Sequence, residues 1–403
     1  MKINKSYKLE IYPDERQRNL FSQAFGTNRY VYNHLLSKCN DYYEEHKKPH
    51  PYKELKSYIT EMKHEYDWMY NVPKSIHQNA YFDLVSAFKT FYRNVKAKKK
   101  VGKKNVYGFP QFKSLHYSKK SFKLDNDRFK MSNQYIVMSI FGKVKLSQYN
   151  YIPSASDTIK YMNATISYRG GKYFVSVSVE HITNDPINIS SEVVGVDLGI
   201  KSLMVCSNGM TFNNPKTYRK HLVKLKRLQK EFNRRKSIKE NNKTIASKRK
   251  RKTKDKLSKH HLRIANIRHD NVHKMTTSLV KTKPMAIVIE NLNVKGMMKN
   301  RKLSQSLADS CFGMIAQTLQ YKCNHYGIEL VKADRFFPSS KLCNSCGSIK
   351  DILSLSERTY SCECGYTQDR DLNAAINLKE YYTQIPMADR EFTLRESIGS
   401  CFN

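Results

Sequence analysis

The stretch VVGVDLGIKSLMVCSNG, residues 193–209, decides the fold. Its first part, Val193–Val196, is a continuous apolar run of the kind found in strands that are covered on both faces, and it ends in Asp197. Two further short apolar segments lie within residues 202–212, on either side of an Asn-Gly pair, and predict a hairpin beside this strand. The stretch therefore predicts a buried strand with a hairpin beside it, in an α/β domain.

A second apolar run, residues 285–289, also reads as a buried strand, and it ends in Glu290. A third acid, Asp371, precedes Ala375 and Leu378 at helical spacing and so falls on the stripe that packs inward. Either strand-end acid alone could be an ordinary turn residue. Together with Asp371 they predict a metal-binding triad, because buried carboxylates repel one another strongly unless divalent cations neutralise them.

Carboxylate oxygens are hard ligands that suit Mg²⁺ or Mn²⁺. Two such ions, roughly 4 Å apart, activate a water molecule and stabilise the departing 3′ oxygen in phosphodiester hydrolysis. The predicted cofactors are therefore two Mg²⁺ (or Mn²⁺) ions at Asp197, Glu290 and Asp371. Asp369, just before the helix, is better placed as its N-cap.

The charge of the chain points to nucleic acid. Its 403 residues contain 72 Lys+Arg against 35 Asp+Glu, which gives a net charge of +37. Such an excess repels itself and favours a polyanionic partner. The basic run at 96–104 leads into Tyr107, Phe109 and Phe112, a mixture that suits phosphates and bases, although a solvated loop is the alternative. Residues 241–260 carry nine Lys/Arg against one acid, as a disordered loop or a helix extension.

The chain has no apolar run of the roughly 18 residues that a membrane span requires, and no signal-peptide pattern at its start. Its nine cysteines are odd in number, and four of them cluster near the C-terminus. We therefore expect a cytoplasmic protein with one metal site and ordinary buried thiols, without a disulfide framework.

The four clustered cysteines form two pairs, Cys343-x2-Cys346 and Cys362-x-Cys364. This spacing fits a zinc ribbon with one structural Zn²⁺, except that the second pair is one residue shorter than the usual CxxC. A glycine follows each pair and permits a tight turn. His269 and His273, one helical turn apart, could mimic a metal pair, but a polar helix surface is the preferred interpretation.

The remaining pattern predicts other elements. Lys2–Ile11 alternates like a strand, helices begin near Pro13 and Pro73, and residues 122–179 read as a small antiparallel β module, barrel-like in form, with a hairpin turn at Arg169–Lys172.

Five segments resemble the transposon-encoded TnpB proteins: GVDLGIKSLMVCSNG (195–209), RHDNVHKMTTSLV (268–280), IVIENLNVKGMMKN (287–300), FPSSKLCNSCG (337–347) and YSCECGYTQDRDLNAAINL (360–378). FGTNRYVYN (25–33) and FPQFKS (109–114) resemble them more weakly. The family consists of RNA-guided DNA nucleases with a RuvC-type, RNase H-like fold, and it is related to miniature type V CRISPR effectors.

The resemblance implies that Asp197, Glu290 and Asp371 are catalytic, that Cys343, Cys346, Cys362 and Cys364 bind zinc, and that Lys74 and Gln78 read a short DNA motif beside the target. It also implies a domain layout. The expected parts are a β-barrel wedge domain (1–12 and 113–185), a helical recognition domain (13–112), a RuvC-like nuclease domain (186–338 and 367–383), a zinc ribbon (339–366) and a flexible tail (384–403).

The expected partners are a guide RNA made from the transposon end and double-stranded target DNA, with one protein monomer per RNA, in the nucleoid of a prokaryotic cytoplasm. Three alternatives remain: an RNA-guided repressor that no longer cuts, a CRISPR-associated effector, and a transposase that joins DNA ends without RNA.

Overall fold

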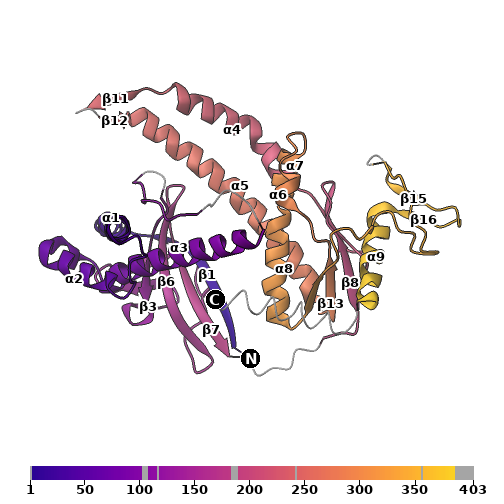
Figure 1. Ribbon diagram of the computed structural model, residues 1–403, viewed down its shortest axis with the longest axis horizontal. Coiled ribbons are helices and arrows are strands. Elements are labelled where there is room, and N and C mark those ends of the chain that lie inside the picture. Colours follow the sequence, from indigo (N-terminus) through magenta and orange to yellow (C-terminus); the bar gives the residue numbers. More distant parts are fainter. Residues whose placement is uncertain are drawn as a thin grey trace. The chain divides into compact units, whose positions relative to one another are not determined.

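A computed structural model describes residues 2–101, 108–115, 118–182, 189–240, 243–354 and 357–385 (Figure 1). The chain divides into two compact units, Met1–Asn184 and Asp185–Asn403. Parts of the basic run at 96–104 and nearly all of the predicted tail lie outside the described residues. Among the described helices, none has the length and apolar character needed to cross a membrane.

A seven-stranded antiparallel sheet dominates the first unit, in the order β2-β6-β7-β1-β5-β4-β3. Its strands are β1 (Lys2–Tyr12), β2 (Lys120–Asp125), β3 (Phe129–Met131), β4 (Tyr135–Met138), β5 (Gly142–Leu146), β6 (Ile159–Arg169) and β7 (Lys172–Ile182). The turn between β6 and β7 confirms the hairpin predicted at Arg169–Lys172. No ladder joins the outer strands β2 and β3 in the described part of the chain, so hydrogen bonding leaves the expected barrel open.

The helices of the first unit are α1 (Glu15–His46), α2 (Leu55–Glu65), the short 3-10 helix η1 (Asp67–Asn71) and α3 (Lys74–Val101). Helix α1 begins with a capping box, in which Asp14 and Gln17 bond each other's backbone N–H groups. Its first half packs Phe21 and Ala24 onto the sheet, whereas its second half packs with α2 and α3 in a separate core. The helices predicted to begin near Pro13 and Pro73 are both confirmed, as α1 and α3.

The second unit contains a five-stranded sheet in the order β10-β9-β8-β13-β14. Its strands are β8 (Val193–Asp197), β9 (Ser202–Cys206), β10 (Thr211–Asn213), β13 (Ala286–Ile289) and β14 (Glu329–Lys332). The strands β8, β13 and β14 are parallel, and the hairpin of β9 and β10 continues antiparallel from β8, as predicted. The α/β character expected from residues 193–209 is thereby confirmed.

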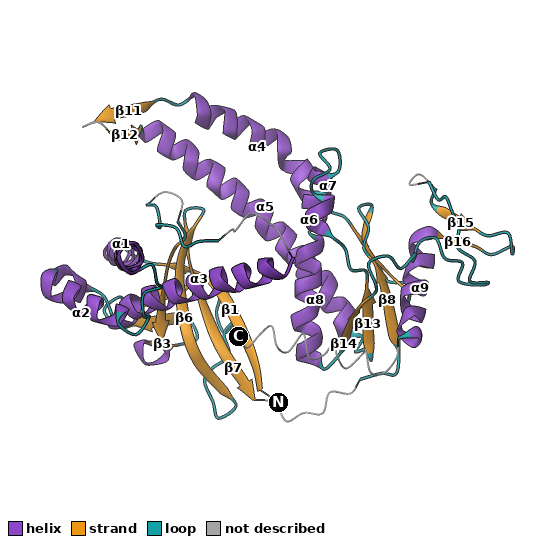
Figure 2. Cartoon of the chain, viewed as in Figure 1, coloured by secondary structure: helices purple, strands orange, loops and turns teal. Residues whose placement is uncertain are grey.

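Helices cover both faces of this sheet (Figure 2). One face carries the C-terminal part of α5 together with α8, and the other carries α9. The helices of the unit are α4 (Thr217–Arg234), α5 (Lys248–Lys281), α6 (Val294–Met297), α7 (Ser304–Ser310), α8 (Phe312–Tyr326) and α9 (Arg370–Gln384). Most of the basic segment 241–260 belongs to α5. A short hairpin of β11 (Ser237–Glu240) and β12 (Lys243–Ala246) connects α4 to α5.

Helix α9 lies unusually close to β8 at Gly195. A Cβ atom on this glycine would lie 2.0 Å from the carbonyl oxygen of Ala375 and 2.4 Å from the backbone nitrogen of Lys379. Both are backbone atoms of α9, so no side-chain rotation could relieve the clash. A residue without a side chain at position 195 therefore sets the distance between the helix and the sheet.

We predict that Gly195→Ala destabilises the second unit strongly, because α9 has to move away from β8. The loss in unfolding free energy should reach or exceed the ~1–3 kcal/mol that overpacking usually costs. Thermal unfolding of the purified protein measures it.

Gly313→Ala is the matched control. Gly313 lies within α8, and a Cβ there would meet no atom within 4 Å. Alanine should raise stability by roughly 0.5–1 kcal/mol, since glycine is the poorer helix former. Equal changes in the stability of the two variants would contradict the inference that α9 packs directly against Gly195.

Candidate active site and metal-binding cluster

Two of the predicted acids lie at the same edge of the parallel sheet. The register pairs Val196 of β8 with Ile289 of β13, and Asp197 and Glu290 are the residues that follow them in the chain. The carboxyl ends of neighbouring parallel strands therefore present both side chains side by side. The alignment follows from the two apolar runs, each of which ends where its acid begins.

The third acid comes from α9. Asp369 caps this helix, accepting hydrogen bonds from the backbone N–H groups of Asp371 and Leu372 at 3.0 Å each. Its predicted role as N-cap is confirmed. Asp371 lies one turn before Ala375, the residue that meets Gly195. The close packing at Gly195 thus brings the first turn of α9 toward the end of β8, where Asp197 lies.

All three carboxylates line one cavity of about 660 Å³. Their oxygens do not form a tight cluster: among the described residues, the only group of three or more metal-ligating side chains whose atoms all lie within 4.8 Å of one another consists of cysteines. Basic side chains form much of the remaining wall of the cavity, namely Lys201, Lys216, Arg219, Arg358 and Arg370. The cavity therefore combines an acidic floor with a cationic wall.

The pKa of Asp197 is raised well above its usual value. Burial is the largest cause, and the neighbouring charges of Glu290 and Asp371 add to it, while Arg370 opposes the shift. The carboxylate of Asp197 is thus destabilised by its surroundings. A divalent cation among these oxygens would remove that penalty, so the donor set fits hard metal ions.

A hydrogen-bond network that the sequence did not reveal holds Glu290. The buried Ser339 donates a hydrogen bond to Glu290 Oε1 at 2.6 Å. The buried Asn377 of α9 donates to the carbonyl oxygens of Ser339 and Leu342, each at 2.8 Å, and Asn373 also donates to Leu342 at 2.9 Å. The two asparagines, one turn apart, join α9 to the segment that precedes the cysteines. The NAAIN stretch at 373–377 was the available signal, because two asparagines on an inward helix face need buried partners.

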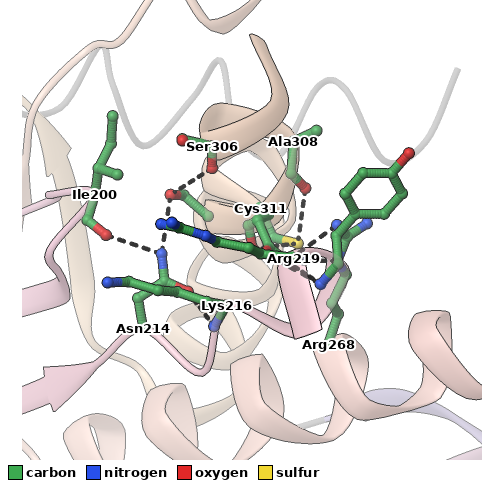
Figure 3. Close-up of polar contacts among 11 residues, drawn as sticks. Ile200, Asn214, Lys216, Arg219, Arg268, Ser306, Ala308 and Cys311 are labelled. Carbon is green, nitrogen blue, oxygen red and sulfur yellow. Dashed lines mark hydrogen bonds and ion pairs between the residues drawn. The ribbon is translucent and has the colours of Figure 1, made fainter. Parts of the chain in front are cut away.

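A second network, centred on a buried acid, supports the cationic wall; Figure 3 labels Asn214, Lys216, Arg219 and Arg268, which surround it. Asp309, which is 7% exposed, accepts hydrogen bonds from the backbone N–H groups of Tyr218 and Arg219 and pairs with Arg268 at 3.0 Å. It thereby caps the first turn of α4 in place of Lys216, which makes no side-chain cap. Nearby, Asn214 donates to the Ile200 carbonyl oxygen at 2.9 Å. These bonds fix the backbone that carries Lys216 and Arg219 into the cavity.

The four predicted zinc ligands come together. The Sγ atoms of Cys343 and Cys364 lie 3.7 Å apart, and those of Cys346 and Cys362 lie 3.6 Å apart. Four thiolates around zinc at about 2.3 Å would be separated by roughly 3.8 Å, the edge of a tetrahedron. The cluster therefore fits one structural Zn²⁺ with no open coordination position. The other described cysteines are free thiols elsewhere in the chain.

The shortened second pair is accommodated by a tighter turn. In the first pair the Gly347 N–H donates to the Cys343 carbonyl oxygen, four residues back, whereas in the second the Gly365 N–H donates to Cys362, three residues back. Both glycines have positive φ, 73° and 88°. The turn after Cys362 is therefore one residue shorter than the turn after Cys343, and the four sulfur atoms still come together. The Ser348 hydroxyl lies 3.2 Å from Cys362 Sγ and is the main cause that lowers the pKa of this thiol to about 6.

The other sequence candidates lie elsewhere. Lys74 and Gln78 are exposed, one turn apart near the start of α3 in the first unit. His269 and His273 lie on α5 with Nε2 atoms 3.1 Å apart, and Tyr321 contacts His273 at 3.2 Å. No third metal-ligating side chain joins these histidines in the described part of the chain.

Comparison with protein families matches residues 174–301 to OrfB_IS605, described as a "Probable transposase", and residues 312–378 to a "Cas12f1-like, TNB domain". Residues 1–48 match a family described as a "Helix-turn-helix domain". In this chain these residues form one strand and one continuous 32-residue helix instead.

Similar curated proteins cover nearly the whole chain. A Streptomyces pristinaespiralis protein named "Putative RNA-guided DNA endonuclease" is 31% identical over 93% of this chain and 89% of its own length. The Escherichia coli protein "Putative RNA-guided DNA endonuclease InsQ" is 29% identical over 94% and 92%. Among solved structures, a Cas12f1–sgRNA–target DNA complex has a TM-score of 0.55 at 14% identity, covering 94% of this chain and 99% of that one, which indicates a shared fold.

We predict that Asp197→Asn stabilises the protein in metal-free buffer near neutral pH. The raised pKa means that ionising Asp197 costs stability in the folded state, and asparagine removes that charge. A gain of ~1 kcal/mol would raise the melting temperature by roughly 2–4 °C.

Two treatments should remove this stability difference between Asp197→Asn and the wild type. As the pH falls through the raised pKa, Asp197 takes up its proton and the advantage of the variant should disappear. Added Mg²⁺ should stabilise the wild type more than the variant. A wild type that melts above Asp197→Asn in metal-free buffer would show that the carboxylate is not under repulsion.

For the cysteine cluster, we predict one zinc ion per chain, measured by elemental analysis. Cys343→Ser should lose most of this zinc, because Cys343 is 1% exposed and its Sγ faces Cys364. Cys311→Ser, which changes a free thiol outside the cluster, should keep it. Full zinc in Cys343→Ser would exclude a four-thiolate site.

Proposed function

This chain belongs to the TnpB family of transposon-encoded proteins, and we propose on that premise that it is an RNA-guided DNA endonuclease. The observation that carries the proposal is the single cavity lined by Asp197, Glu290 and Asp371. Three acids of distant sequence positions share it in a chain that has 72 Lys and Arg residues against 35 acids. A protein that only bound nucleic acid would gain nothing from mutually repelling carboxylates at this point.

In the proposed active site, Asp197, Glu290 and Asp371 hold two Mg²⁺ ions in a RuvC-type nuclease domain. Bound ions of this kind supply activation of a water molecule and neutralisation of the charge on the departing 3′ oxygen. Ser339 orients Glu290 through its 2.6 Å hydrogen bond. The surrounding arginines and lysines bind the phosphates of the strand and position the scissile bond.

The proposed guide is an RNA made from the transposon end, held by the basic surfaces of the protein. Base pairing with this RNA selects the target, while side chains read only a short motif in the duplex. Lys74 and Gln78 are our candidates for that reading, since both are exposed on one stripe of α3. The zinc ribbon is structural, and its ties to α9 support the wall of the cavity.

Cleavage assays and genetic context distinguish an RNA-guided endonuclease from the three alternatives, a silent repressor, a transposase and a CRISPR effector. A silent repressor would bind guide and target without cutting, and a transposase would join DNA ends after RNase treatment. A CRISPR effector shares the chemistry and differs in genetic context, where a repeat array rather than transposon ends would flank the gene.

We predict that Asp197→Ala abolishes target cleavage but leaves guide RNA and target binding nearly unchanged. The substitution removes one metal ligand from the cavity and alters no basic residue. Cleavage of a plasmid and gel-shift titration with the co-purified RNA measure the two properties.

Lys201→Ala serves as a comparison at the same cavity, since it removes a positive charge and keeps the three acids. It should reduce cleavage without abolishing it. Wild-type cleavage by Asp197→Ala, or its loss of RNA binding while still folded, would contradict the assigned role.

A further inference from the structure

The first unit contains a cavity that neither the active site nor the zinc cluster explains. Its volume is about 470 Å³, within the ~300–1,000 Å³ range of small-molecule sites. It lies among the C-terminal part of α1, the loop before α2 and the second half of α3. Six of its lining residues are aromatic, namely Tyr43, Tyr52, Phe88, Phe91, Tyr92 and Phe109.

The rings are arranged as a partly open cage. Phe109 stands edge-on to Phe88 and to Phe91, with interplanar angles of 87° and 85° and centroids 5.8 and 5.2 Å away. Phe109 itself is 44% exposed and Tyr43 is 54% exposed, although both rings are large and apolar. Part of each of these two rings is therefore accessible at the cavity, where a planar ligand could stack on it.

Polar groups occupy one side of this aromatic cavity. Asn40 and Glu44 lie one turn apart on α1 and place an amide and a carboxylate on its wall. His50, which is buried, is fixed by contacts to the Pro51 carbonyl oxygen at 3.0 Å and to the Tyr58 hydroxyl at 3.3 Å. The wall can thus both donate and accept hydrogen bonds at the edge of a ligand.

A basic hollow adjoins the aromatic cavity. Tyr52 and Tyr92 line both, and the hollow, of about 440 Å³, is otherwise formed by Lys89, Arg93 and Lys96. These three cations lie at i, i+4 and i+7 on α3 and so share one face of the helix. An anionic group would be attracted to this point, beside a ligand whose flat part enters the aromatic cavity.

We propose that the aromatic cavity binds one unstacked nucleobase of a single strand, and that Lys89, Arg93 and Lys96 bind the adjoining phosphate. Aromatic stacking and a neighbouring positive charge are the two features that single-strand sites combine. An apolar side chain of a partner protein would use the rings but not the three cations. This inference rests on the proposed function, since it assumes that the protein holds nucleic acid strands.

The strand can be the guide RNA or one strand of the target DNA, and crosslinking separates them. Phe109→p-benzoylphenylalanine places a photoreactive group at the opening, in the full-length protein. A crosslink in the complex with guide RNA alone identifies the RNA. One that forms only after target DNA is added identifies the DNA. Tyr149→p-benzoylphenylalanine is the control, because Tyr149 is 64% exposed in the same unit and does not line the cavity.

Affinity gives the second measurement. Phe109→Leu keeps an apolar side chain but removes the ring, and it should weaken binding of the crosslinked strand by about 5- to 150-fold, the range expected for one lost stacking contact. Arg93→Gln should also weaken binding of this strand, and it should make the affinity less dependent on salt concentration. Tyr149→Leu should change neither, and unchanged melting temperatures would verify that the variants are folded.

The results also separate this proposal from the one before it. If the wild type retains guide RNA and cleaves, yet Phe109→p-benzoylphenylalanine crosslinks no nucleic acid in either complex, or crosslinks only protein, the nucleobase site is refuted and the endonuclease proposal stands. Effects of Phe109→Leu no larger than those of Tyr149→Leu would refute it equally. A wild type that neither retains RNA nor cleaves under its direction would overturn both.

Discussion

The contact between the backbone of α9 and Gly195 governs the second unit. A strand and a helix usually keep apart by the length of their side chains, but here a Cβ at position 195 would fall 2.0 Å from a helix carbonyl oxygen. Asp371 lies in the first turn of α9, which Asp369 caps. The contact between α9 and Gly195 therefore also determines where Asp371 lies relative to Asp197. The absence of a side chain at Gly195 therefore determines both the packing of α9 on β8 and the position of Asp371 relative to Asp197.

Charge divides the cavity into two environments with different physics. Asp309 is buried but accepts backbone N–H groups and a guanidinium, so its charge is compensated by the protein itself. Asp197 is surrounded by other acids, and its pKa is raised by burial and by their charges. In a chain with a net charge of +37, many cations were available to pair with an acid, yet the charges around Asp197 are mostly those of other acids, with Arg370 as the opposing cation. The contrast marks Asp309 as a structural acid and Asp197 as one suited to a bound cation.

The sequence predicted the features that depend on local pattern. The apolar runs located β8 and β13 and their terminal acids, and the spacing of the cysteines located the cluster despite the shortened pair. It could not predict contacts made by residues distant in sequence, such as Ser339 with Glu290 or Asp309 with the start of α4, because a serine or an aspartate in a loop has many possible partners. The open edges of the seven-stranded sheet were missed for the same reason, since closure depends on how distant strands meet. The catalytic and DNA-reading roles of the named residues stay predictions.

The hydrogen bonds between α9 and the segment that leads into the cysteines give the cysteine cluster a consequence beyond its own fold. Asn373 and Asn377 bond the backbone at Ser339 and Leu342, and Leu342 immediately precedes Cys343. Ser339 in turn bonds Glu290. These hydrogen bonds join the segment before Cys343 both to the helix that carries Asp371 and to the carboxylate of Glu290. Disorder around the cysteines would therefore disturb two of the three acids. Zinc, bound to four thiols that otherwise have only weak contacts with one another, would therefore stabilise the geometry of a site that contains none of its ligands.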